Sequence, residues 1–293
     1  MENLTKALLI AAGMLIAIMI LSLLVIAYNR ISGFYEHQQE ILSAEQLDKF
    51  NKQFQTYADR ENIRGNELIS LMNKIIDYNV SQSYQDGTNY EPIKVKITIG
   101  NQFVEAFKYE TDEGTKLGVQ NNYITPVIEN TVDNVNNQSN DKKLIEITNT
   151  PNDAMQKAQS VGINNITDTQ LQKLTMEIST ILVDESRTDN SSNEYRRLRA
   201  IALRNILKLD IGTTPENDIY IDPTTYKTIR GGEKIEAIKE IVSQYYQYTQ
   251  FKRACFKCPA EGVKYNPETG RVIQMNFEVQ TEVQNGETVV KFN

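Results

Sequence analysis

The amino-acid sequence predicts an α+β fold: an N-terminal transmembrane helix that continues into an amphipathic stalk helix, followed by a domain with an antiparallel β-sheet and several helices. Three observations support this prediction: an uncharged apolar run at residues 7–28, helical spacing of apolar residues after it, and alternating strand-like segments near the C-terminal end. Helices that precede a group of antiparallel strands are typical of α+β proteins. We expect a short cytoplasmic tail at 1–6, the transmembrane helix at 7–28, stalk helices at 29–80, and an α+β domain at 81–293 that ends in a β-meander.

The apolar run at residues 7–28 contains no formally charged side chain. A helix of about 20 apolar residues spans the hydrocarbon core of a bilayer, where the backbone must satisfy its hydrogen bonds internally. Secretory signal peptides have a shorter apolar region that ends in an A-x-A-like cleavage site. Residues 26–30 contain no such motif, so a retained anchor is favoured over a cleaved signal. We therefore expect a single-pass protein of the cell membrane, with the short tail in the cytoplasm and the C-terminal domain extracytoplasmic.

The stalk region contains the residues that we expect to mediate assembly. Residues 31–57 contain no proline, and their apolar side chains recur at helical spacing in two stripes that are rotated relative to each other. The candidate assembly residues lie on these stripes: Phe34, Ile41, Leu47, Phe50, Phe54 and Tyr57. Two interpretations remain open, since such a helix can lie on its own domain or can pack against neighbouring subunits while it is anchored in the membrane.

Gly65 interrupts the helical pattern, and Asn66 can cap a new helix that continues to about Asn79. A β-hairpin is expected over residues 93–109, because apolar and polar side chains alternate in its first half and Gly100-Asn101 can form the turn.

A further strand is expected at 144–148. The rest of 129–165 is rich in asparagine and poor in large apolar side chains, so we interpret it mostly as loop.

Three amphipathic helices are expected between residues 167 and 251, with a short strand at 219–221 before the third. The first is capped by Thr167 or Asp168, and the second begins at Asn193 or a neighbouring serine. The second helix should bury its apolar residues, which are Tyr195, Leu198, Ala202, Ile206 and Leu209.

The opposite stripe of that second helix is basic and contains Arg197, Arg204 and Lys208. This stripe could face anionic lipid headgroups or an acidic neighbour. We interpret it as a solvated face, which is the usual role of such charge clusters.

Alternating segments at 262–265, 271–281 and 287–292 predict the C-terminal meander. The Asn-Gly pair at 285–286 is a strong hairpin signal, because both residues tolerate the positive φ angles of a tight turn.

Cys255 and Cys258 form the one recognisable short motif, C-x-x-C. Such a pair can be a redox site, but here it follows a predicted helix instead of opening one. A zinc site would need a second pair of ligands. In an exported domain we expect a local disulfide that fastens the end of the third helix to the first strand of the meander.

The charge balance limits the classes of partner. The chain has 31 Lys and Arg residues against 38 Asp and Glu residues, a net charge of −7, whereas binding to nucleic acid needs clustered positive charge. A single histidine, His37, leaves little scope for histidine-based catalysis, and no pair of carboxylates predicts general acid–base chemistry. We predict that the chain is not an enzyme, binds no nucleic acid, cofactor or metal, and has no evident small-molecule substrate.

Two segments carry a resemblance to a known family. Residues 1–11, MENLTKALLIA, and 63–73, IRGNELISLMN, resemble small membrane-anchored, pilin-like proteins associated with Tad-type (tight adherence) pilus systems of Gram-positive, clostridia-like bacteria. Type IV prepilins have an acidic residue at the fifth mature position. After Gly13 that position would be Ile18, so the chain departs from the processed prepilin pattern.

The resemblance implies a structural or accessory subunit of a cell-surface, pilus-like assembly that is anchored and assembled through its N-terminal helix. Its partners would be the membrane and the proteins of that assembly, including other copies of this chain. The alternative is a single-pass extracytoplasmic ligand-binding or sensor protein that acts through a membrane partner.

Overall fold

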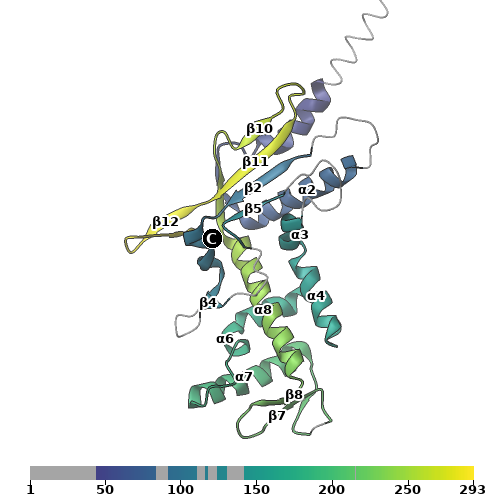
Figure 1. The fold of residues 1–293 in the computed structure, drawn as a ribbon, viewed down its shortest axis with the longest axis vertical. Helices are drawn as coiled ribbons and strands as arrows, with labels where there is room; N and C mark the ends of the chain where they lie inside the picture. The colour runs from purple at the N-terminus through teal and green to yellow at the C-terminus, as the bar shows by residue number, and fades with distance from the viewer. Residues whose placement is uncertain (1–43, 84–91, 111–115, 118–123, 131–141, 215) are drawn as a thin grey trace, which may run out of the picture. The chain divides into compact units, whose positions relative to one another are not determined.

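The computed structural model describes residues 44–83, 92–110, 116–117, 124–130, 142–214 and 216–293. The chain divides into two compact units, one formed by residues 1–56 and 267–271 and the other by residues 57–266 and 272–293. In the first unit, residues 44–55 are helical and residues 267–271 form a turn. The second unit is α+β, as predicted, and contains the strands and helices described below (Figure 1).

The second unit is built on a six-stranded sheet with the order β1-β9-β11-β2-β5, in which β10 also pairs with β11. The strands are β1 (Arg60–Arg64), β2 (Lys94–Thr98), β5 (Val127–Glu129), β9 (Cys255–Cys258), β10 (Val263–Tyr265) and β11 (Val272–Val279). Strands β2 and β11 run parallel, with Val95 opposite Met275, while the other pairs are antiparallel. The predicted antiparallel sheet is therefore a mixed sheet.

The mixed pairing has a local cause, because the predicted hairpin over 93–109 does not form. Residues after β2 make the 3-10 helix η1 (Asn101–Phe107) instead of a return strand. Phe107 is buried and packs edge-on against Phe292, with ring centroids 5.9 Å apart. Its continuation, β3 (Tyr109–Glu110), pairs with β4 (Lys116–Leu117). One edge of β2 is then available to β11, and the other pairs with β5.

Strand β1 and helix α2 (Gly65–Ser83) occupy the second half of the predicted stalk region. Strand β1 pairs with β9, so sheet structure interrupts the helices expected at 29–80. Helix α2 begins at Gly65, one residue before the predicted cap Asn66. A Cβ atom at Gly65 would lie 1.7 Å from the carbonyl oxygen of Phe251, so the two backbones require glycine at this contact. The helix continues past Asn79, whose buried side chain bonds both the N–H of Ile93 (2.9 Å) and its carbonyl oxygen (3.1 Å).

The helices of the second unit pack mainly around α8 (Gly232–Arg253), which contacts α2, α4, α5 and α6 (Figure 1). The others are α3 (Lys142–Thr148), α4 (Thr150–Ser160), α5 (Asp168–Met176), α6 (Ile178–Ile181) and α7 (Asn190–Leu207). Helices α5, α7 and α8 confirm the three predicted late helices, although a short break at Glu177 separates α6 from α5.

Much of the region predicted as strand and loop is helical, at residues 142–148 and 150–160, while residues 161–165 form turns, in agreement with the loop prediction. In α3, Leu144 and Ile147 are buried at a spacing of three residues, and in α4 the buried Ala154 and Ala158 are four residues apart. Proline in the first turn of α4 fits the helix start. The prediction failed because small alanines, which carry little hydrophobic signal, form the buried face of α4.

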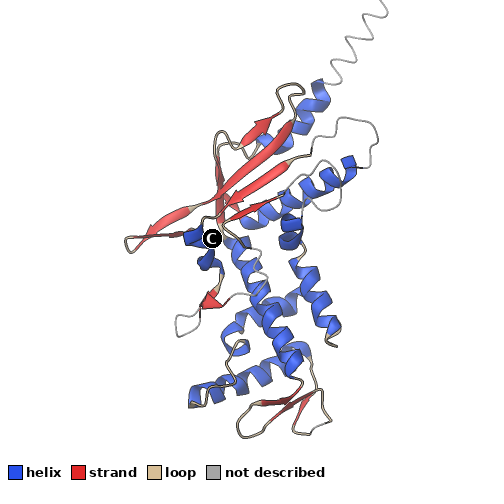
Figure 2. Ribbon diagram, in the orientation of Figure 1, coloured by secondary structure: helices blue, strands red, loops and turns tan. Residues whose placement is uncertain are grey.

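Besides the β3–β4 pair, two smaller sheets complete the described part of the second unit (Figure 2). Strands β6 (Ile211–Gly212), β7 (Ile219–Ile221) and β8 (Thr228–Arg230) form one of them, which confirms the predicted strand at 219–221. Strands β12 (Thr281–Gln284) and β13 (Glu287–Val290) form a hairpin, in which Asn285 and Gly286 have φ angles of 52° and 85°. This hairpin confirms the Asn-Gly turn that the sequence predicts.

No helix in the described part of the chain is long and apolar enough to cross a bilayer. The predicted tail and transmembrane helix at residues 1–28 lie outside the described residues.

Candidate functional site

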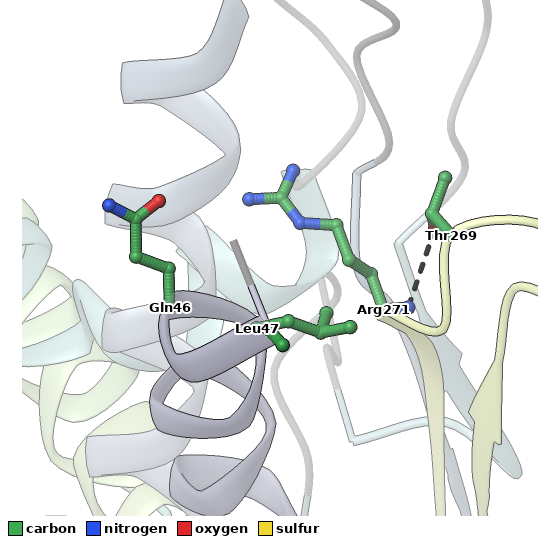
Figure 3. Close-up of a pocket in the computed structure, with 5 residues that line it drawn as sticks. Gln46, Leu47, Thr269 and Arg271 are labelled. Carbon is green, nitrogen blue, oxygen red and sulfur yellow. Dashed lines mark hydrogen bonds between the residues drawn. The ribbon is translucent and has the colours of Figure 1, made fainter. Parts of the chain in front are cut away.

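The predicted assembly helix is described over residues 44–55, where Leu47, Phe50 and Phe54 lie on one stripe. This stripe contacts the turn at 267–271, within the same unit (Figure 3). The side-chain amide of Asn51 donates to the carbonyl oxygen of Gly270 (2.8 Å), and the guanidinium of Arg271 lies 5.0 Å from the centroid of the Phe50 ring. Part of the stripe is therefore covered by a turn of the same chain.

Beside this contact is an open hollow of about 340 Å³. Its lining residues are Ala44, Gln46, Leu47, Thr269 and Arg271 (Figure 3). The backbone N–H of Arg271 donates to the Thr269 hydroxyl at 3.4 Å, which holds the turn in place below the arginine side chain.

The six candidate assembly residues have different positions. Phe34 and Ile41 lie outside the described residues. Phe54 is buried and meets Phe50 edge-on, with ring centroids 5.3 Å apart. Leu47 and Phe50 are half-buried and keep accessible apolar surface.

Tyr57 follows the helix instead of lying on it, and it belongs to the second unit. Its ring packs edge-on against Phe277 at 6.3 Å and lies under the guanidinium of Arg60 at 5.7 Å. Burial, with a smaller effect from Glu67, raises the pKa of Tyr57. This residue therefore contributes to the packing of the α+β unit.

The predicted disulfide does not form, because Cys255 and Cys258 are both free thiols. Both residues lie in the extended strand β9, where positions i and i+3 point to opposite faces of the sheet. Their Cα atoms are separated by three strand residues, roughly 10 Å, whereas a disulfide requires less than about 7 Å. The chain enters a sheet strand directly after α8, where the prediction assumed a bend that would bring the cysteines together.

The environment of the two thiols makes them unreactive. Burial raises the pKa of Cys255, and burial with a smaller effect from Asp59 raises the pKa of Cys258 to about 11. The thiolate is the nucleophile in cysteine chemistry, so neither residue is activated at neutral pH. A Cβ atom at Gly262 would lie 2.7 Å from the sulfur of Cys258, so this thiol fills space against the turn between β9 and β10.

Helix α7 buries two arginine side chains, which the sequence analysis did not predict. Arg196 and Arg199 are 1% and 0% exposed, while Leu198 and Ile201 are 36% and 42% exposed. The prediction that Leu198 faces the core is therefore wrong, and the buried face is rotated toward the arginines. Arg197 does lie on a solvated face, as predicted, and it pairs there with Glu194 at 2.6 Å.

The buried arginines hold the loops around α7. Arg196 donates to the carbonyl oxygens of Arg187 (2.9 Å) and Thr225 (3.1 Å), and to the side chain of Asn193 (2.7 Å). Because carbonyl groups of separate loops accept these bonds, Arg196 joins the segment before α7 to the turn between β7 and β8.

Arg199 pairs with the carboxylate of Glu185 and also donates to the hydroxyl of Thr228 at 3.2 Å. The backbone N–H of Thr228 donates to the same carboxylate at 3.0 Å. Burial raises the pKa of Glu185, but the hydrogen bonds from Thr228 and the charge of Arg199 outweigh it, so this pKa lies below its ordinary value. Arg199 Nε and Nη1 have no hydrogen-bond partner among the described residues. One carboxylate therefore neutralises Arg199, while backbone oxygens solvate Arg196.

The outer side of α7 borders an open hollow of about 280 Å³, which we call the α7 hollow. Its lining residues are Arg197, Ala200, Ile201 and Arg204 of α7, Ile211, Gly212 and Thr213 at β6, and Ile221, Asp222, Pro223 and Tyr226 after β7. Arg204 donates to the carbonyl oxygen of Ile211 at 2.6 Å, and the Asp222 carboxylate accepts from the N–H of Thr225 at 2.6 Å. The α7 hollow thus combines an apolar lining with two arginines, and its one carboxylate is used within a turn.

A third hollow, of about 410 Å³, lies where β2 and β11 end. It is lined largely by polar groups, and the ammonium group of Lys257 lies 3.2 Å from the carboxylate of Glu278 beside it.

The described residues contain no group of histidine, cysteine, aspartate or glutamate side chains that could hold a metal ion. His37 lies outside them. Comparison of the chain with protein-family models, with curated proteins and with solved structures finds no match.

Sequence reasoning missed the buried arginine face because it assigned arginine to the solvent. The signal was present, since Ser192, Arg196, Arg199, Leu203 and Leu207 follow helical spacing and are all buried. A stripe that mixes arginine with leucine can be recognised as a core face only if other segments supply acceptors, and those segments are distant in sequence.

Proposed function

We propose that this chain is a structural or accessory subunit of a cell-surface, pilus-like assembly, anchored and assembled through its N-terminal helical segment. The observation that carries the proposal is the uncharged apolar run at residues 7–28, followed by a segment with apolar stripes at helical spacing. Such a run is long enough to span a bilayer as one helix. The α+β unit would then lie outside the cytoplasm.

The accessible part of the amphipathic helix supports an assembly role. Leu47 and Phe50 are half-buried at the Gly270 turn and leave apolar surface for another chain. The side chains that could carry out chemistry have structural roles. Both thiols are buried and have raised pKa values, and the Glu185 carboxylate pairs with the buried Arg199. These features favour a structural subunit over a membrane-tethered enzyme.

The alternative, a single-pass extracytoplasmic ligand-binding or sensor protein, is favoured by one observation. The hollow at the ends of β2 and β11, about 410 Å³, falls within the size range of small-molecule sites, roughly 300–1,000 Å³. Ligand sites of that kind are mostly apolar, whereas this hollow is open and largely polar. We therefore place assembly first.

The membrane topology can be tested on intact cells stripped of their wall. A C-terminal tag on the full chain should be removed by added protease while a cytoplasmic control protein survives. Survival of the tag until lysis would contradict the proposed orientation.

Assembly can be tested by mild detergent extraction and native electrophoresis. We expect the full chain to migrate in complexes with other copies or with membrane partners, and the double variant Leu47→Asp/Phe50→Asp to lose most of them. The matched control is Gln53→Asp/Gln55→Asp, which places the same charges at exposed positions of the same helix, away from the hollow. A wild-type monomer that co-purifies with a small ligand would overturn the assembly proposal in favour of the alternative.

A further inference from the structure

One face of the main sheet is polar and carries unpaired lysines. Alternate residues of β2 and β11 are buried, and the residues between them point to the opposite face of the sheet. On that opposite face Lys94 of β2 lies opposite Gln274 of β11, and Gln274 lies opposite Lys264 of β10. Both lysines are exposed, and neither side chain has an ion pair or hydrogen bond with a described residue. We call this surface, which also includes Lys96 and Asn276, the lysine face.

The carboxylates on the same side of the sheet have their own neighbours. Glu278 pairs with Lys257 at 3.2 Å, and Glu129 lies opposite Lys96. The residue opposite both unpaired lysines is the uncharged Gln274. The lysine face is therefore a positive patch on a chain of net charge −7, and such a patch attracts an acidic partner.

The β12–β13 hairpin, residues 281–290, is an exposed two-stranded ribbon of the opposite charge (Figure 2). It contains two glutamates and no lysine or arginine. Gln284 lies opposite Glu287 and shares a face with Glu282, because side chains alternate along a strand. These three residues form the acidic face of the ribbon, and Val283 lies on the other face. Neither carboxylate has an ion pair with a described residue.

The spacing of the two glutamates is compatible with that of the two unpaired lysines. Glu282 and Glu287 are diagonal neighbours on paired strands, about 7–8 Å apart. Lys94 and Lys264 are separated by one intervening strand, so their Cα atoms are roughly 10 Å apart. The lysine side chain is long and flexible and can compensate for a difference of this size. One ribbon can therefore place a carboxylate beside each lysine.

The ribbon cannot reach the lysine face of its own chain. Strand β12 continues the direction of β11 and leads away from the main sheet (Figure 1). Glu282 lies eight residues beyond Gln274, which is roughly 26 Å along an extended strand. The acidic face therefore needs the lysine face of another molecule.

We propose that the acidic face of the ribbon of one copy of this chain docks on the lysine face of a second copy, with Glu282 and Glu287 beside Lys94 and Lys264. A second copy is the partner because the chain itself supplies both of the complementary surfaces. The inference rests on the proposed assembly function and adds its contact surface.

Ribbon and lysine face are different surfaces, so the contact is heterologous. A repeated heterologous contact generates a closed ring or an open filament, unlike the self-complementary contact of a two-fold dimer. A hairpin buries less surface than the ~1,200 Å² of a stable interface, so the contact alone is weak. Anchoring of neighbouring copies in one membrane raises their effective concentration and makes such a contact sufficient.

Cysteine cross-linking of the full chain in membranes tests the inference. Two differently tagged copies are co-expressed, one with Gln284→Cys on the acidic face and the other with Lys96→Cys on the lysine face, and treated with a short bismaleimide. Both positions are exposed, and neither substitution removes one of the four contact charges. We expect a product that carries both tags. The wild-type chain controls for Cys255 and Cys258, which are buried.

The matched control is Thr288→Cys, which replaces Gln284→Cys and lies on the other face of the same ribbon, opposite Val283. Because its side chain points away from the contact, it should give roughly tenfold less mixed product. Equal yields from the two ribbon positions would overturn the inference, because the acidic face would then not be the contacting face.

Charge reversal provides a second readout. Glu282→Lys/Glu287→Lys in the Gln284→Cys copy should lower the mixed product about tenfold, because like charges would then face each other. Lys94→Glu/Lys264→Glu in the partner copy should restore most of the yield, and this recovery would also show that both variants fold. A yield that charge reversal leaves unchanged would overturn the inference.

The cross-linked products also separate this inference from the proposed function. A product from Gln284→Cys copies alone would indicate ribbon-to-ribbon contact and would overturn the inference. Absence of the mixed product while native complexes persist would overturn it and leave the proposed function standing. Absence of native complexes of the wild-type chain would contradict both.

Discussion

Helices α2 and α7 both have a buried face at helical spacing, but they obtain it in different ways. The buried face of α2 is apolar and includes Leu68, Met72 and Ile75, all fully buried. The buried face of α7 carries Arg196 and Arg199, and leaves Leu198 partly exposed. Apolar burial positions the first helix, and the spacing of its apolar residues predicts this. The second is positioned by acceptors in distant loops, which its own sequence does not reveal.

Removal of the Glu185 carboxylate, the counter-charge of the buried Arg199, should have the largest effect. Glu185→Ala leaves the guanidinium of Arg199 buried without its counter-charge, and loss of one partner of a buried pair costs about 3–5 kcal/mol. We expect the free energy of unfolding to fall by about that amount in urea unfolding followed by near-UV circular dichroism. The control is Glu194→Ala, which removes the exposed partner of Arg197 and should leave the free energy of unfolding almost unchanged.

The second-largest effect is expected when the stability cost of truncating a leucine is compared between the two helices. Leu68→Ala in α2 creates a cavity in the core and should cost about 2–5 kcal/mol. Leu198→Ala in α7 removes a partly exposed side chain and should cost less than about 1 kcal/mol. Equal losses for the two variants in the same unfolding measurement would mean that Leu198 belongs to the core after all.

A smaller effect is expected from pH. Because the pKa of Glu185 in the folded protein lies below its ordinary value, its contribution to stability is present above the unfolded-state pKa, about 4.3, and is lost as the pH falls through the folded-state pKa. The variant Glu185→Gln should therefore show a shallower loss of stability below about pH 4 than the wild-type chain. Parallel curves for the two proteins would show that Glu185 is not linked to this loss.

The smallest effect concerns the cysteines of β9. Because both are free thiols in the structure, a reducing agent should leave the melting temperature unchanged. Thiol labelling should be slow in the folded protein and complete in denaturant, since both thiols are buried with raised pKa values. A melting temperature that drops on reduction would restore the disulfide prediction.

The features that the sequence predicted correctly depend on short-range signals. Thr167 and Gln170 form a reciprocal capping box at the start of α5, and Asn285 and Gly286 form the β12–β13 turn. In each case the interacting groups are a few residues apart, so local chemistry determines the structure.

The features that it missed depend on distant partners. The parallel pairing of β2 with β11 joins segments from opposite ends of the second unit. The prediction placed the two cysteines at a bend after the helix, and it was wrong because distant strands determine their position. Strand β9 lies in the sheet between β1 and β11. Within the candidate site, the stripe through Leu47, Phe50 and Phe54 follows from helical spacing, but the turn at Gly270 that covers part of it does not.

The pairing of β1 with β9 also affects when the protein can fold. Strand β1 lies at the start of the second unit, and its partner β9 follows α8 near the end of the chain. Pairing over such a separation closes a long loop and is slow, because the chain entropy is lost before the contacts form. The main sheet therefore cannot be completed on a partly synthesised chain. Until β9 and β11 are made, β1 and β2 lack these neighbours, and the closing of β9 and β11 onto them is the step that completes the sheet.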